Sequence, residues 1–145
     1  MTRWHVEAIG VLFLCVMAVQ EGMLFAEETS LEAIIVNGDE VEYFPEEKKV
    51  VGKGNISIDY KGSTVTADSV TVYLDTKDAE AEGEVILTHG RDEFRGEKLQ
   101  YNFETRQGTL KDARGKVLPW YFGGETIERK GENEFLVEGG YLTTC

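Results

Sequence analysis

Few side chains in this sequence have the types and spacing that metal binding requires. The sequence contains two histidines, His5 and His89, and two cysteines, Cys15 and Cys145. His5 and Cys15 lie in an N-terminal apolar segment, so one histidine and one cysteine remain for the rest of the chain. That pair does not complete the four-ligand set that zinc usually takes. We therefore expect no metal and no cofactor.

Nucleophilic catalysis has equally little support. Ser57 and Ser63 fall on a predicted strand and a predicted turn, and no general base lies near them in the sequence. Glu40 and Glu42 alternate with apolar residues, which places them on the polar face of a strand, where carboxylates are usually only solvated. We predict that the chain is not an enzyme, because a secreted hydrolase would need a base that the sequence does not offer.

The charge of the chain excludes one class of partner. Its 145 residues carry a formal net charge of −12. An acidic surface repels phosphate backbones, so we expect no nucleic-acid partner. The length suits one ordinary domain with its own core.

Residues 1–26 have the features of a secretory signal. A run of twelve residues without charge, Ala8–Val19, follows Arg3. This run is too short to span a bilayer comfortably, and a basic start before it is typical of a signal that is cleaved, here after Ala26 or after Ala18. An uncleaved anchor and a first core element remain open as alternatives. After cleavage Cys145 would be the only cysteine, in an oxidising compartment.

Alternating residues predict strands further along the chain. Apolar side chains occupy every second position of Ile56–Tyr60 and of Val65–Ala67, and Lys61-Gly62-Ser63 separates the two runs. Such alternation indicates strands with one buried face, and a glycine between them indicates a hairpin turn.

The same units recur at a nearly constant spacing. Acidic residues that precede an alternating run stand at 39, 68, 97 and 125, in steps of 29, 29 and 28 residues. A fixed period of this size indicates one supersecondary unit stacked on its copies. Each unit is predicted to pair two strands, namely 40–44 with 50–60, 64–74 with 79–88, 93–103 with 108–113, and 126–130 with 135–142. We expect a lead-in over 27–36 and one all-β domain over 37–145.

The apolar face of these strands has no amphipathic helix to cover it. The sheet must therefore cover this face with itself, which predicts a folded-over antiparallel β-jelly roll. Small residues recur on the buried side, at Gly52, Gly54, Ala79, Ala81 and Gly83. They either leave room for an acyl chain between the two layers or mark bulges and close approaches of the sheet. Both interpretations remain open.

The segment Leu118–Gly124 interrupts the alternation. Three successive aromatic residues, Trp120–Phe122, stand between a proline and two glycines and would be unusual in a plain hairpin. Either these rings close one end of the core, or they line the mouth of the interior and contact lipid or a partner.

Several of these motifs resemble a known family. Gly38–Tyr43, Gly52–Tyr60 and Ala67–Val70 are similar to the repeats of the OstA-like domain of lipopolysaccharide (LPS) transport proteins. Further on, Gly124–Arg129 and Gly140–Cys145 resemble the N-terminal periplasmic domain of the LptD family of outer-membrane LPS-assembly proteins. The resemblance covers about residues 35–145.

The resemblance implies a periplasmic domain that receives LPS acyl chains in an apolar groove and passes them toward the outer membrane. It implies a jelly roll that stacks edge to edge with a matching domain of a periplasmic bridge protein. It also implies assembly with an outer-membrane β-barrel, to which Cys145 would form a disulfide. The residues expected to line the groove are Ile56, Ile58, Val65, Val70, Val72, Val85, Leu87, Leu99, Tyr101 and Phe103. A structural β-module without lipid, which assembles through its edges, is the alternative.

One difference from the family concerns length. The LptD family continues into a large outer-membrane β-barrel, whereas this sequence ends at Cys145. A fragment of a longer protein and a stand-alone domain that works in trans both remain open.

Overall fold

The computed structural model describes residues 33–144, which form ten strands of one antiparallel sheet and no helix. The expected signal over 1–26, most of the lead-in and Cys145 lie outside the described residues. The strands are β1 (Ile35–Asn37), β2 (Glu40–Phe44), β3 (Lys49–Tyr60), β4 (Ser63–Tyr73), β5 (Asp78–His89), β6 (Asp92–Asn102), β7 (Gly108–Val117), β8 (Trp120–Arg129), β9 (Phe135–Glu138) and β10 (Tyr141–Thr143).

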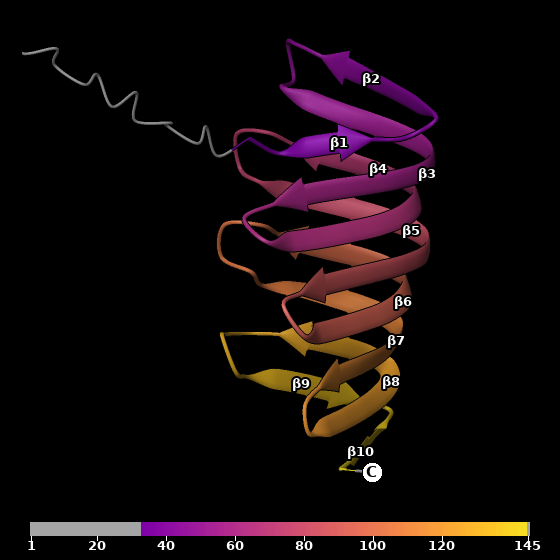
Figure 1. Ribbon diagram of the computed structural model, residues 1–145, viewed down its shortest axis with the longest axis vertical. Helices are drawn as coiled ribbons and strands as arrows, with labels where there is room; N and C mark the ends of the chain where they lie inside the picture. The colour runs from indigo at the N-terminus through magenta and orange to yellow at the C-terminus, as the bar shows by residue number, and fades with distance from the viewer. Residues whose placement is uncertain (1–32, 145) are drawn as a thin grey trace, which may run out of the picture.

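Six long strands, β3 to β8, form a simple meander in which each strand pairs with the next. They follow one another along the long axis of the molecule (Figure 1). At one end β1 and β2 pair with two separate parts of β3, and at the other end β9 and β10 pair with two separate parts of β8. The prediction of an all-β antiparallel fold is confirmed.

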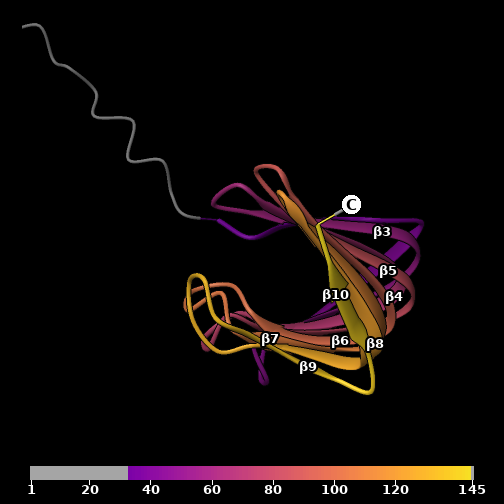
Figure 2. The same ribbon diagram turned by 90° about the horizontal axis from the view of Figure 1, so that it is seen from below.

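The sheet folds over because its long strands bend at aligned bulges. Figure 2, which looks along the stack, shows the strands curving round one interior. Backbone φ angles are positive at Gly54 and Asn55, at Gly83 and Glu84, and again at Asp112. Positions 54, 83 and 112 are one 29-residue repeat apart, and the pairing register shifts at the first two. A bulge bends its strand and increases the local twist, so bulges at the same place in each repeat produce one continuous corner.

The acidic residues that mark the repeat lie at this corner. A Cβ placed on Gly54 would lie 3.1 Å from the Cβ of Asp39, and one placed on Gly83 would lie 2.8 Å from the Cβ of Asp68. The Asn55 side-chain amide also donates to the Asp39 carboxylate at 2.9 Å. An acidic side chain at the corner of one strand thus packs on the glycine of a following strand, which explains why the two residue types recur together.

Two details of the strand prediction were wrong. Val117 pairs with Trp120, so β7 and β8 form a plain hairpin through Leu118-Pro119, whose peptide bond is cis. The aromatic run forms the start of β8, where Phe122 is buried while Trp120 and Tyr121 are exposed. The strand predicted over 135–142 is divided into β9 and β10, since its two parts pair with β8 on either side of the corner.

We expect the corner to be sensitive to added volume at its glycines. Gly83→Ala should lower the free energy of unfolding by about 2–4 kcal/mol, because the positive φ and the crowding against Asp68 both oppose a methyl group. Gly90→Ala is the matched control. Gly90 also has positive φ, but a Cβ there meets nothing within 4 Å, so we expect a loss of about 1 kcal/mol. Equal losses in urea denaturation would contradict the packing of the corner.

Candidate functional site

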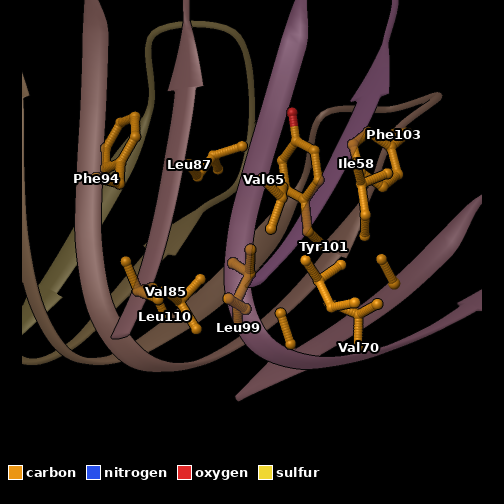
Figure 3. Packing of buried hydrophobic residues seen from close by; sticks show 14 of the residues in the cluster. Ile58, Val65, Val70, Val85, Leu87, Phe94, Leu99, Tyr101, Phe103 and Leu110 are labelled. Atoms are coloured by element: carbon orange, nitrogen blue, oxygen red, sulfur yellow. The ribbon is translucent and has the colours of Figure 1, made fainter. Parts of the chain in front are cut away.

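The interior of the folded sheet contains all ten residues that the sequence placed in a lipid groove. None of them is more than 6% exposed, and they belong to one apolar cluster (Figure 3). They come from β3, β4, β5 and β6, except Phe103, which follows β6 directly. The alternation of each strand brings them together, because every second side chain points inward on both sides of the corner.

Sequence reasoning missed the part of the interior nearer the C-terminus. Phe94, Leu110, Phe122 and Ile127 are also buried and extend the same cluster toward β8. The alternation within β6 and β7 was a signal that could have identified Phe94 and Leu110. Phe122 was missed because the prediction began the strand at 126, whereas β8 begins at Trp120.

The middle of the interior is closely packed. The cavity between Leu99 and Leu110 has a volume of about 20 Å³, which is close to the room that one water molecule needs. The small residues do not leave a slot either. Gly54 and Gly83 lie at bulges, and a Cβ on Gly52 would lie 2.7 Å from Ile56. An acyl chain could therefore enter this part only if the two sides of the folded sheet moved apart.

A larger apolar pocket lies at the β8–β10 end of the interior. We call it the end pocket; its volume is about 570 Å³. Its lining consists of Val117, Leu118, Trp120, Phe122, Asn133, Phe135, Val137 and Leu142. Within this set Phe122 is buried, and it connects the end pocket to the core through ring contacts with Phe94 at 6.0 Å and with Phe135 at 5.5 Å.

Along its length the folded sheet is closed by contacts between two rows of turns. Tyr60 and Lys61, at the end of β3, meet Glu104 in the turn after β6, although β3 and β6 are not neighbours in the sheet. The Tyr60 hydroxyl donates to the Glu104 carboxylate at 3.0 Å, and the Lys61 ammonium lies 3.6 Å from it. Lys77, in the turn after β4, lies over the Tyr60 ring at 5.8 Å. We call these interactions, together with the one between His89 and Arg106, the rim contacts.

The last rim contact belongs to a serine–histidine pair that the sequence did not reveal. Ser63 Oγ lies 2.9 Å from His89 Nδ1, and Arg106 Nη1 lies 3.1 Å from His89 Nε2. Because the guanidinium can only donate, Nε2 must accept and Nδ1 must carry the proton. His89 then donates to Ser63, which is the reverse of the arrangement that activates a serine nucleophile. The contact between His89 and Arg106 joins the two rims, whereas Ser63 and His89 face each other on the neighbouring strands β4 and β5. The serine–histidine pair does not form a catalytic dyad.

Burial and the hydrogen bond to Glu104 raise the pKa of Tyr60, and the nearby Lys61 opposes part of this effect. The Tyr60 hydroxyl therefore remains protonated, and able to donate across the rim, to a higher pH than an exposed tyrosine would.

No group of three or more His, Cys, Asp or Glu side chains within residues 33–144 is arranged to hold a metal ion. The same residues include no helix that is long and apolar enough to cross a membrane.

A single meander sheet, folded over an apolar interior with a pocket at one end, defines the chain as a β-jelly-roll domain. Residues 22–117 match the family described as "Lipopolysaccharide-assembly, LptC-related". The chain therefore belongs to this LptC-related lipopolysaccharide-assembly family, which confirms the resemblance to OstA-like domains at the level of the family.

Sequence relatives are LPS-assembly proteins. The chain is 27% identical over 142 residues to the LPS-assembly protein LptD of Nitrosomonas eutropha. This alignment covers 93% of the chain and 19% of the relative. It is 31% identical over 113 residues to LptD of Acinetobacter baumannii, and this alignment covers 77% of the chain and 14% of the relative. The chain thus spans less than a fifth of the length of these curated relatives.

A solved structure has the same fold. LptH, described as the LptA homologous periplasmic component of the conserved lipopolysaccharide transport device from Pseudomonas aeruginosa, superimposes with a TM-score of 0.65. Its sequence is 18% identical, and the match covers 75% of this chain and 84% of LptH.

The raised pKa of Tyr60 predicts an alkaline loss of stability. Below pH 10 the side chain is protonated in both the folded and the unfolded states, so its contribution is complete. As the pH rises above 10 the unfolded state loses this proton first, and stability falls until the folded side chain also ionises. Urea denaturation of Tyr60→Phe should show a smaller decline between pH 10 and 11.5 than the wild type.

Tyr43→Phe serves as the control for this measurement, because Tyr43 is 54% exposed. Its pH profile should match that of the wild type. A Tyr60→Phe profile that also matches the wild type would contradict the rim contact between Tyr60 and Glu104.

Proposed function

We propose that this chain is a periplasmic LPS-binding domain that takes up acyl chains in its apolar interior and passes them toward the outer membrane. The observation that carries the proposal is the continuous apolar cluster, which runs from β3 to β8 and adjoins the end pocket at Phe122. Membership of an LPS-assembly family supports it. The lining residues are the ten named in the sequence analysis, extended by Phe94, Leu110, Phe122 and Ile127.

Within the family, we propose a role of the LptD type. The sequence relatives named LptD support this assignment, since one of them aligns with 93% of the chain. On this proposal residues 1–26 are an export signal that is removed. Cys145, two residues after β10 ends, forms a disulfide with the outer-membrane β-barrel.

The ends of the stack suit assembly with similar domains. The sheet ends in β1 and β2 on one side and in β9 and β10 on the other, so each end presents strand edges. An exposed edge can accept a further strand through backbone hydrogen bonds. We propose that one of these edges pairs with a matching domain of a periplasmic bridge protein, which would extend the apolar interior from one domain into the next.

A purely structural β-module is the second candidate, and one specific observation favours it. The cavity in the middle of the interior has a volume of only about 20 Å³, so the core side chains fill the interior without a lipid. The LPS proposal therefore requires that the rim contacts break and the two sides of the sheet separate when an acyl chain enters.

Trp120 provides a direct test of lipid binding, because it lines the end pocket and is 45% exposed. In a Trp4→Phe background it is the only tryptophan. We expect a saturable fluorescence change on addition of lipid A. Leu118→Glu should weaken this binding at least tenfold, because it places a charge in the pocket.

Leu136→Glu is the matched control for Leu118→Glu. Leu136 is exposed on the face of β9 opposite Phe135 and Val137, outside the pocket lining. It should bind lipid A as the wild type does. No fluorescence response at any lipid concentration would favour the structural module.

A cross-link between the rims distinguishes entry into the interior from binding at the end pocket alone. Lys61→Cys and Glu104→Cys, in a background with both native cysteines replaced by serine, place thiols on opposite rims. We expect a short thiol cross-linker to reduce lipid A binding at least tenfold, since the sides can no longer separate. Either single variant, treated in the same way, is the control. Unchanged binding by the cross-linked protein would show that acyl chains do not enter between the rims.

A further inference from the structure

One polar atom in the apolar interior stands apart from the rest. Tyr101 is 3% exposed, and its hydroxyl is the buried side-chain polar atom for which residues 33–144 offer no hydrogen-bond partner. Buried polar groups are nearly always paired, because an unpaired one loses its hydration without compensation. A phenylalanine would fill the same space without this cost, so the hydroxyl calls for an explanation.

The surroundings of Tyr101 are apolar and hold its ring in place. Its ring packs edge to face on Phe103, with the centroids 5.1 Å apart. Figure 3 shows the ring within the cluster of buried apolar side chains. Tyr101 also lines the small interior cavity, together with Leu87, Phe94, Leu99, Gly108, Leu110, Ile127 and Arg129. The hydroxyl is therefore a fixed polar point in a hydrocarbon environment.

Arg129 is the other polar side chain at this cavity, and it is already engaged. Its Nε donates to the carbonyl of Gly131 at 3.1 Å, and its Nη2 donates to the carbonyl of Glu132 at 2.9 Å. The guanidinium also lies 5.5 Å from the centre of the Phe135 ring. These contacts hold Arg129 against the turn that follows β8, whereas the Tyr101 hydroxyl has no hydrogen-bond partner among residues 33–144.

A trapped water satisfies this hydroxyl poorly. The cavity has room for about one water molecule, but an ordered buried water usually makes about three hydrogen bonds. The remaining lining is hydrocarbon apart from Arg129 and the backbone of Gly108. A phosphate or a sugar would fit still worse, because a charged or highly hydroxylated group would lose its hydration here.

We propose that Tyr101 is a specificity residue that hydrogen-bonds a polar group within an acyl chain, either a hydroxyl substituent or the carbonyl of an ester or amide linkage. Such a chain has hydrocarbon for the leucine and phenylalanine side chains and one group that can pair with the phenol. An unsubstituted hydrocarbon segment at this point leaves the hydroxyl unpaired. This inference rests on the proposed uptake of acyl chains and specifies which acyl chains the interior prefers.

The test compares 3-hydroxymyristate with myristate, two ligands of equal chain length, in the Trp4→Phe protein. With Trp120 fluorescence as the readout, we expect the hydroxylated acid to bind about three- to tenfold more tightly, as one hydrogen bond predicts. Tyr101→Phe should lose the preference for the hydroxylated acid. Tyr141→Phe, at a position 57% exposed, should keep it.

Stability provides a second readout that does not depend on ligand. Tyr101→Phe removes an unpaired buried hydroxyl, so its unfolding temperature should equal or exceed that of the wild type. A lower unfolding temperature would show that the hydroxyl has a partner in the folded protein and would overturn the inference. A preference that survives in Tyr101→Phe, or is absent from the wild type, would also overturn it. If neither acid binds the wild type, the proposed function itself fails.

Discussion

The structure depends on one requirement, which is that a sheet with a single apolar face must bury that face against itself. The apolar side chains of β3 to β8 all lie on the same side, and residues 33–144 include no helix to cover them. Burial of apolar surface is the dominant favourable term in folding. Folding the sheet along a line across its strands is the solution that keeps every backbone hydrogen bond of the ladder except those at the fold itself.

The 29-residue repeat makes that line straight. Positive φ angles recur at 54, 83 and 112, and the turns on one rim recur with positive φ at Lys48, Lys77 and Arg106, again in steps of 29. Successive turns are also bonded to each other, since Leu74 N donates to Lys48 O and Phe103 N donates to Lys77 O, both at 2.9 Å. Because each repeat places its corner and its turn in register with the next, the apolar residues form one continuous interior and not a series of separate cores.

The sequence was sufficient for those features that depend on neighbours along the chain. Alternation identified the buried face of β3 to β6, and the spacing of acidic residues identified the repeat. Features that depend on the folding-over itself could not be predicted in this way. Tyr60 and Glu104 are 44 residues apart, and His89 and Arg106 belong to opposite rims, so these contacts exist only after the two rims meet. The aromatic run at 120–122 was misread because apolar residues there do not alternate with polar ones, although Phe122 is buried and Trp120 and Tyr121 are exposed.

The packed interior and the proposed passage of acyl chains are compatible because the two sets of contacts differ in strength. The strands are joined by continuous backbone ladders, whereas the rims are joined by a few side-chain contacts. The Lys61–Glu104 pair is 40% and 56% exposed at its side chains, and exposed ion pairs contribute only about 0–1 kcal/mol each. An acyl chain that replaces the apolar contacts of the interior would therefore have to break the rim contacts but none of the ladders. Separation at the rims, with the line of bulges as the axis, is the motion that the distribution of hydrogen bonds favours.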